Sequence, residues 1–135
     1  MLKKHALGRQ VLAELHGCPP DKLDDPKIIQ REMSAAAVAA GAEIKNAIFH
    51  HFSPYGVSGV VVISESHLAI HTWPEHGYAA LDIFTCGQTI DPWIPCHYLN
   101  DILRARNMTA HEIRRGIFNT IRRHKPPAGA PGDIR

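Results

Sequence analysis

The sequence has little that would tie it to a membrane or to an oxidising compartment. Its 135 residues include only three cysteines, Cys18, Cys86 and Cys96, which form no paired framework. No run of about 18 apolar residues occurs, so no membrane span is predicted. The N-terminal stretch MLKKHALGRQ lacks the apolar centre of a signal peptide. We therefore expect a reduced, cytoplasmic protein.

The sequence also has little excess of either sign of charge. The formal net charge of +2 is too small to predict a nucleic-acid partner. Basic residues gather between Arg104 and Lys125, and we interpret them as a solvated surface. A hydrophobic content of 44% is typical of a globular domain, which we place at residues 1–125. The Pro- and Gly-rich residues 126–135 are predicted to be a disordered tail.

The first forty residues predict one strand and one helix. Residues Leu7 to Leu15 alternate loosely as a strand does, and Pro19-Pro20 ends the pattern. Asp24 or Asp25 is placed to cap a helix that has Pro26 in its first turn. Apolar residues then recur at three- and four-residue spacings, at Ile28, Ile29, Met33, Ala36, Ala37 and Ala40. Gly41 suits the end of this helix.

The rest of the chain predicts mainly strands. Four strand-like segments cover residues 43–52, 57–64, 67–73 and 78–85, a second helix runs from Asp91-Pro92 to about Ala105, and a last strand covers residues 108–113. This order predicts an α+β two-layer sandwich, an antiparallel sheet with helices on one face. Residues 60–63 are apolar on both faces, which predicts a central strand with a cover on each side. A dimer partner is the natural second cover.

The most informative stretch is residues 61–75, VVISESHLAIHTWPE. Upstream, PYGVSGVVV contains Ser58, and downstream, YAALDIFTCG contains Cys86. This nearly unbroken pattern, from Phe52 to Gly87, resembles the prokaryotic-type S-adenosylmethionine decarboxylases. The resemblance implies a proenzyme that cuts its own chain before a serine and so makes a covalent pyruvoyl cofactor.

Ser66 is the serine that the resemblance marks, and cleavage is expected between Glu65 and Ser66. A serine hydroxyl can attack the preceding carbonyl and convert the amide into an ester. Removal of the Cα proton then expels the upstream chain, and loss of ammonia leaves the pyruvoyl group. For an isolated Glu-Ser pair, a serine in an ordinary turn would be the better interpretation; the long motif reverses that preference.

His71 is the candidate base for this elimination, because a neutral imidazole accepts protons near pH 7. The alternative is a half-buried strand histidine. His67 lies on the same strand face, and we expect it beside the new N-terminus. On a strand, positions four apart are roughly 13 Å apart, so the two histidines predict no metal site.

Cys86 is expected to return a proton to the substrate carbon after decarboxylation, because an ordinary thiol is protonated at neutral pH. Its alternative role is that of a small buried hydrophobe. Ser58, with glycines on either side, is a candidate for oxyanion or carbonyl stabilisation, or else a plain strand residue. Cys18 and Cys96 are interpreted as bystanders.

The resemblance also places Phe52, Trp73 and Glu75 in the substrate pocket. Two aromatic faces suit a planar purine and a sulfonium, and a carboxylate suits ribose hydroxyls. Core packing is the commoner role for single aromatic residues. The implied function is decarboxylation of S-adenosylmethionine for spermidine biosynthesis, through a Schiff base on the pyruvoyl group, by a homodimer of cleaved protomers. The alternatives are the same chemistry on ornithine or arginine, and an unprocessed regulatory paralogue.

Overall fold

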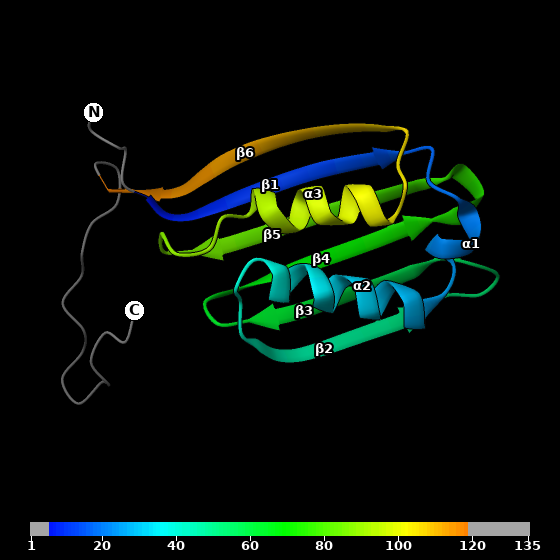
Figure 1. Ribbon diagram of the computed structural model, residues 1–135, viewed down its shortest axis with the longest axis horizontal. Coiled ribbons are helices and arrows are strands. Elements are labelled where there is room, and N and C mark those ends of the chain that lie inside the picture. The colour runs from blue at the N-terminus through cyan, green and yellow to red at the C-terminus, as the bar shows by residue number, and fades with distance from the viewer. Residues whose placement is uncertain (1–5, 119–135) are drawn as a thin grey trace.

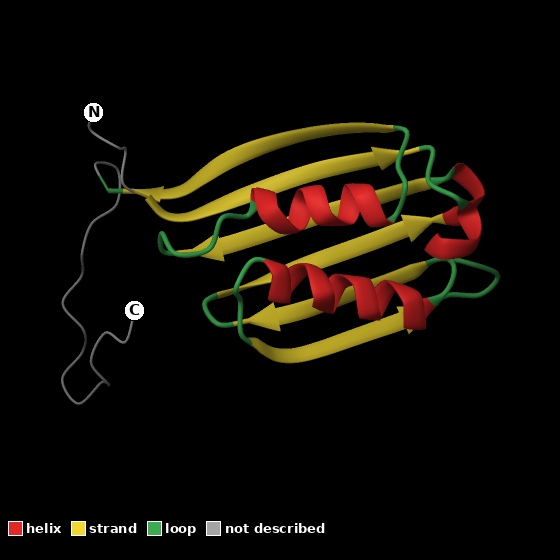
Figure 2. Ribbon diagram, viewed as in Figure 1, coloured by secondary structure: helices red, strands yellow, loops and turns green. Residues whose placement is uncertain are grey.

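The computed structural model describes residues 6–118, which form one six-stranded sheet with two longer helices on one face (Figures 1 and 2). In chain order the elements are β1 Ala6–His16, α1 Pro20–Leu23, α2 Pro26–Ala39, β2 Ile44–His51, β3 Val57–Ile63, β4 Ser66–Trp73, the 3-10 helix η1 Pro74–His76, β5 Tyr78–Cys86, α3 Trp93–Ile102 and β6 Asn107–Ile117. The predicted tail at residues 126–135, and the boundary at residue 125, lie outside the described residues.

The sheet is antiparallel at each of its pairings, in the order β2-β3-β4-β5-β1-β6. Helix α2 packs on β2 and β3, and α3 packs on β1 and β5. Both helices lie in front of the sheet in Figure 1, so the predicted α+β two-layer sandwich is confirmed. The structure of residues 6–118 contains no helix long and apolar enough to span a membrane.

Helix α2 begins and ends where its sequence predicts. The Asp25 side chain accepts a hydrogen bond from the Lys27 N–H at 2.9 Å, which satisfies one free donor of the first turn. At the other end Gly41 has a φ of +81° and donates to the Val38 carbonyl, while Ala42 donates to Ala37. This is the Schellman arrangement, which needs a left-handed residue after the cap. The apolar stripe between these ends buries Ile29, Met33, Ala36 and Ala37.

Other boundaries differ from the prediction. Helix α3 ends at Ile102 and not near Ala105, because Arg104 takes a left-handed φ of +56° that a continuing helix excludes. The last strand is longer than predicted and reaches Ile117. The short α1 and η1 were not predicted, since a single turn is too short to show apolar periodicity.

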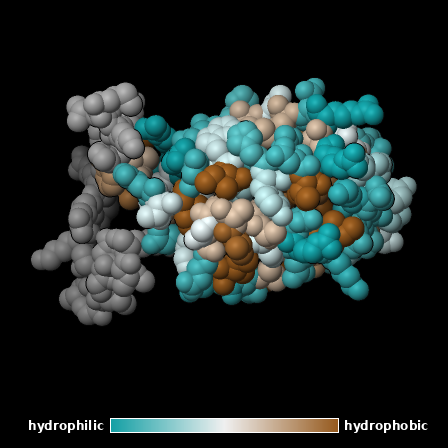
Figure 3. Space-filling view, in the orientation of Figure 1, coloured by the Kyte–Doolittle hydropathy of each residue, from teal (hydrophilic) through white to brown (hydrophobic). Residues whose placement is uncertain are grey.

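Alternation along the strands separates two faces of the sheet. The face toward the helices carries the buried core, including Val61 and Ile63 of β3, Leu68 and Ile70 of β4, and Ile83 of β5. Figure 3 shows the outer surface of that helical layer, where hydrophobic residues form small separate patches. We call the opposite side the open face, because the described residues place no helix over it.

The open face exposes large apolar side chains. They include Leu12, Ile48, Val62 and Ile113, which are between 38% and 61% exposed. Strand β3 is flanked by β2 and β4, as the apolar run at residues 60–63 predicted, but only its helix-side residues are covered within one chain. An apolar sheet face of this kind is typical of a surface that another chain covers.

A polar link fastens the start of α3 to the edge of the sheet. Glu112 on β6 accepts two hydrogen bonds from Arg9 on β1, at 2.8 and 3.0 Å, and one from the Trp93 indole N–H at 2.7 Å. The Arg9 hydrogen bonds lower the pKa of Glu112 to about 2, with Trp93 contributing and partial burial opposing. One carboxylate therefore joins two strands and a helix.

We expect Glu112→Gln to lower the stability of the protein at neutral pH and to weaken its acid sensitivity. The folded pKa of Glu112 is depressed, so its contribution is present above the ordinary value of 4.5 and is lost as pH falls toward about 2. Urea unfolding at several pH values should show a flatter acid limb for this variant. Glu43→Gln is the matched control, because Glu43 pairs with Lys45 on the surface. Equal acid limbs for the wild type and Glu112→Gln would contradict this role.

Candidate active site

The register of β4 decides where the predicted site residues lie. Leu68, Ile70 and Thr72 face the core, so His67, His71 and Trp73 point to the open face. Ser58 of β3 lies opposite His71. Cys86 is on the side of β5 that alternates with the buried Thr85, and therefore also belongs to the open face. These residues fall into two groups at opposite ends of the strands.

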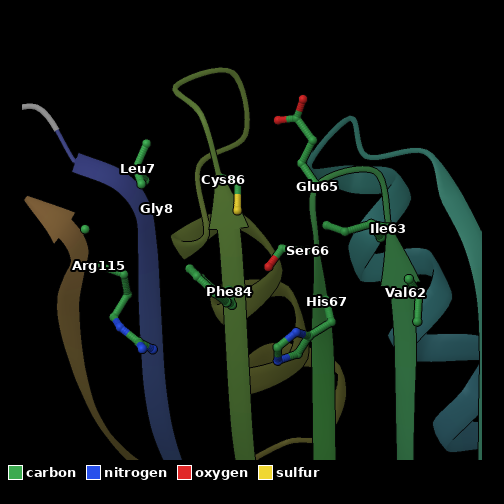
Figure 4. Close-up of a pocket in the computed structure, with 11 residues that line it drawn as sticks. Leu7, Gly8, Val62, Ile63, Glu65, Ser66, His67, Phe84, Cys86 and Arg115 are labelled. Carbon is green, nitrogen blue, oxygen red and sulfur yellow. The ribbon is translucent and has the colours of Figure 1, made fainter. Parts of the chain in front are cut away.

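The first group surrounds the β3–β4 turn and lines a pocket of about 520 Å³ (Figure 4). We call it the turn-end group: Glu65, Ser66, His67, Phe84, Cys86 and Arg115. Ser66 and His67 begin β4, while Phe84 and Cys86 end the neighbouring β5, so the hydroxyl and the thiol open into one cavity. His67 lines the same pocket as Ser66.

The turn that carries the expected cleavage bond is conformationally unusual. Ile63 pairs with Ser66, so Ser64 and Glu65 form a two-residue hairpin turn. Glu65 has a φ of +69°, a left-handed conformation that costs a residue other than glycine roughly 1–2 kcal/mol. Hairpins normally place Gly or Asn at such positions. Strain is therefore held at the residue whose carbonyl precedes Ser66.

A polar chain lies beside the pocket on the open face. Arg115 donates to Gln10 at 2.5 Å, and Gln10 donates to Asp82 at 2.6 Å. The Arg115 guanidinium also lies 5.5 Å from the centre of the Phe84 ring, within reach of a cation–π attraction. His67 Nε2 is 3.9 Å from Asp82. The charged groups here already have partners within one chain.

The second group lies at the other end of the strands, where the β2–β3 loop and the β4–β5 connection meet. We call it the loop-end group: Phe52, Ser58, His71, Trp73, Glu75 and Tyr78. Ser58 Oγ and His71 Nδ1 are 2.7 Å apart, a hydrogen bond whose donor depends on the imidazole tautomer. Ser58 therefore fixes the orientation of the His71 ring and leaves Nε2 available for other contacts.

Two aromatic side chains of the loop-end group are exposed. Phe52 is 47% exposed and Trp73 is 41% exposed, and Glu75 is exposed in η1 beside Trp73. The Phe52 loop is held by Asp24, which accepts the Gly56 N–H at 2.9 Å and pairs with His51 at 2.9 Å. The Gly56 hydrogen bond, followed by that of His51, lowers the pKa of Asp24. The loop is thus fixed although its aromatic ring is open to ligand.

The structure does not bring His71 to Ser66 within one chain. The two residues are five positions apart on β4, which at about 3.3 Å per residue is roughly 16 Å. A general base acts at hydrogen-bond distance, or through one water molecule. A single copy of the chain therefore holds the nucleophile with Cys86 at one end and the candidate base with Ser58 at the other.

Sequence reasoning missed three neighbours of these groups. Tyr78 stacks on Trp73, and Arg115 and Phe84 line the Ser66 pocket. Alternation along residues 78–86 could have placed Tyr78 and Phe84 on the face of Cys86. No local signal pointed to Arg115, because it reaches the pocket through the long-range pairing of β6 with β1.

The three cysteines have different surroundings. Cys18 and Cys96 are buried at 3% and 0% exposure, and burial raises both thiol pKa values, that of Cys96 to about 11. Cys86 is partly exposed and lines the pocket. Among residues 6–118 no three His, Cys, Asp or Glu side chains gather as a metal site would require.

Comparison with known proteins identifies close relatives. A sequence model of the S-adenosylmethionine decarboxylase family matches residues 9–116. The S-adenosylmethionine decarboxylase proenzyme of Caldicellulosiruptor saccharolyticus is 56% identical over 114 residues, which cover 84% of this chain and 92% of that protein. That of Clostridium kluyveri is 55% identical over 115 residues, with coverage of 85% and 91%. The crystal structure of the adenosylmethionine decarboxylase of Aquifex aeolicus superposes with a TM-score of 0.80 at 32% identity, covering 88% of this chain and 98% of that one.

We expect a thiol reagent to modify Cys86 alone in the folded protein. Thiolate is the reactive form, and burial disfavours it at Cys18 and Cys96. Brief treatment with iodoacetamide, followed by peptide mass spectrometry, should show one labelled site, and the same treatment in denaturant should show three. Early labelling of Cys96 in the native protein would contradict the burial of that thiol beneath α3.

Proposed function

Because the chain belongs to the S-adenosylmethionine decarboxylase family, we propose that it is a self-processing enzyme that converts S-adenosylmethionine into decarboxylated S-adenosylmethionine and CO2 for spermidine synthesis. The observation that carries this proposal is the Glu65–Ser66 bond. It lies in a strained two-residue turn, directly beside a pocket that also contains Cys86, and it falls inside the family match.

Processing begins with attack of the Ser66 hydroxyl on the Glu65 carbonyl. The amide becomes an ester, and the Ser66 nitrogen becomes a free amine. A base then removes the Ser66 Cα proton, the C–O bond breaks, and Glu65 leaves as a carboxylate. The remaining dehydroalanine tautomerises to an imine, and water displaces ammonia. The products are residues 1–65 and a chain that begins with a pyruvoyl group at position 66.

His71 is the proposed base, and it acts on Ser66 of a second copy. The roughly 16 Å between them within one chain leaves His71 unable to reach its own Ser66. Two copies that pack open face to open face, with a twofold axis across the strands, bring the loop end of each against the turn end of the other. A twofold dimer of this kind is the commonest homo-oligomer. Each site then takes Ser66 and Cys86 from one copy and His71 and Ser58 from its partner.

The open face supports this association. It exposes Leu12, Val62 and Ile113, which gives apolar surface to bury. Its charged residues already pair within the chain, because Arg115 is bound to Gln10 and Gln10 to Asp82. Burying charged groups that keep their partners avoids the large cost of isolated buried charges.

The residues present fit a pyruvoyl group at position 66. The cavity in front of Ser66 has space for a substrate, and a thiol and an imidazole line it. When bound, such a group would take the substrate amine and accept the electron pair left by departing CO2. Cys86 is the proposed proton donor to the substrate carbon. Phe52 and Trp73 would hold the adenine ring, and Glu75 the ribose hydroxyls.

Ser66→Ala should leave one uncut chain without decarboxylase activity, because the variant lacks the hydroxyl that attacks the Glu65 carbonyl. Intact-mass measurement should show two fragments for the wild type and one chain for the variant. Release of CO2 from S-adenosylmethionine, ornithine and arginine, measured side by side on processed protein, tests the substrate. Release from ornithine or arginine alone would overturn the substrate assignment but not the processing chemistry.

Coexpression of two inactive variants should restore processing. Ser66→Ala lacks the nucleophile and His71→Ala lacks the base, so neither is expected to process alone. In a mixed dimer the Ser66→Ala copy supplies His71 to Ser66 of the other copy. Different affinity tags would then show cleavage of the His71→Ala chain only. If the mixed dimer forms and neither chain is cut, the proposal that the partner copy supplies the base is wrong.

A further inference from the structure

A row of residues crosses five positions of the open face at the loop end. Phe52 donates its N–H to the Gly56 carbonyl at 2.7 Å, and Trp73 pairs with Tyr78. The pairing of Ser58 with His71, continued by two residues, sets Gly56 beside Trp73. The pairing of Leu15 with Ala79, continued by one, sets His16 beside Tyr78. The row therefore reads Phe52, Gly56, Trp73, Tyr78, His16.

Three rings of this row stack on one another. Trp73 and Tyr78 have centroids 5.1 Å apart at 26°, and Tyr78 and His16 have centroids 5.2 Å apart at 21°. These spacings are close to the distance between neighbouring strands, so the rings stand side by side on the sheet. One face of the Trp73 ring is consequently covered by Tyr78, and the other is turned toward Gly56.

Gly56 interrupts the row of rings. It has no side chain, so the space above it separates Phe52 from Trp73 by two strand spacings, about 9–10 Å. A planar ring inserted there would lie about 4.7–4.9 Å from each aromatic neighbour, inside the range of stacked pairs. We call this space the slot over Gly56. The slot accepts one flat ring, and its width is set by the strand register.

We propose that Tyr78 is a positioning residue that holds Trp73 as the rigid wall of the slot over Gly56, with Glu14 fixing Tyr78 in turn. This rests on the proposed function, in which the adenine ring of the substrate occupies the slot. Tyr78 closes the far side of Trp73, so a purine can stack on one face only. The direction from which the adenosyl group enters is thereby fixed.

Glu14 holds Tyr78 in place by a hydrogen bond, in addition to the ring stacking. The Tyr78 hydroxyl donates a hydrogen bond to the Glu14 carboxylate from the neighbouring strand β1. Burial, and then this carboxylate, raises the pKa of Tyr78 to about 12. The hydroxyl thus stays protonated and remains a donor at any working pH. The opposite wall is fixed separately, because Asp24 binds the Gly56 N–H behind Phe52.

The test uses the uncut Ser66→Ala protein. The chain has two tryptophans, so the added change Trp93→Phe leaves Trp73 as the single source of tryptophan fluorescence. Adenosine is the ligand, so the result does not depend on the pyruvoyl group or on turnover. Titration should change Trp73 fluorescence. Tyr78→Leu should weaken adenosine binding about three- to tenfold, the loss expected for one stacking wall that is no longer held. It should also shift the ligand-free emission to the red, because Trp73 gains water contact.

Two further variants separate positioning from a general loss of structure. Tyr78→Phe keeps the ring but not the Glu14 hydrogen bond, and should restore most of the adenosine affinity. Tyr98→Leu is the matched control, because Tyr98 also donates to a carboxylate, that of Glu32, but on the helical side. It should bind adenosine like the parent protein. In mature enzyme, Tyr78→Leu should raise KM for S-adenosylmethionine by the same factor and leave kcat nearly unchanged.

Unchanged emission and unchanged adenosine affinity in Tyr78→Leu would overturn the positioning role. A Trp73→Ala enzyme tests separately whether the purine lies in the slot. Here the measurement is how strongly adenosine inhibits CO2 release from S-adenosylmethionine. If adenosine competes equally against the parent and Trp73→Ala enzymes, the purine lies elsewhere and the slot is wrong. If Trp73→Ala weakens adenosine binding and the Tyr78 variants do not, the purine does lie in the slot, but Tyr78 does not position Trp73.

Discussion

The antiparallel pairing of β4 between β3 and β5 is the constraint on which the rest of the molecule depends. With a side-chain period of two, one register places Leu68 and Ile70 in the core and, by the same step, His67 and His71 on the open face. Thr72 locks that register, because its hydroxyl accepts the Val57 N–H and donates to the Leu23 carbonyl, each at 2.8 Å. A slip of one residue would bury both histidines and expose the core side chains.

The same pairing explains how the fold tolerates a cut in its centre. The expected cleavage lies in the β3–β4 turn, and β3 remains bonded to β2 and β4 while β4 remains bonded to β5. Few ladder hydrogen bonds depend on the turn itself. The left-handed Glu65, by contrast, is held only while the turn is intact, so cleavage can release a cost that the folded proenzyme carries. Strain is thus placed at a connection whose loss leaves the strand pairing in place.

Much of the fold could be read from local pattern. Alternation and turn residues gave the strands, and Asp25, Pro26 and Gly41 gave the bounds of α2, because each acts on its own neighbours. The candidate site could be predicted only as a set of residues, since the motif lists side chains without their distances. That Ser66 and His71 lie at opposite ends of β4 follows from the strand rise, which becomes decisive once both are known to be on one strand. Glu14 and Arg115 could not be found from sequence, because they reach the site through long-range strand pairings. Glu14 does so through the β1–β5 pairing and Arg115 through the β1–β6 pairing.

The division of the site between two ends of one sheet limits how apolar the open face can be. On the proposed twofold association, this face must serve as interface and as active site together, so it cannot be wholly apolar. The structure meets both demands by pairing its polar groups internally: Arg115 with Gln10, Gln10 with Asp82, Tyr78 with Glu14, and Ser58 with His71. Polar groups that keep a hydrogen-bond partner are buried in an interface at little free-energy cost. Unpaired polar groups would each cost about several kcal/mol on burial. Apolar side chains between the two ends, such as Leu12 and Ile48, then remain to drive association.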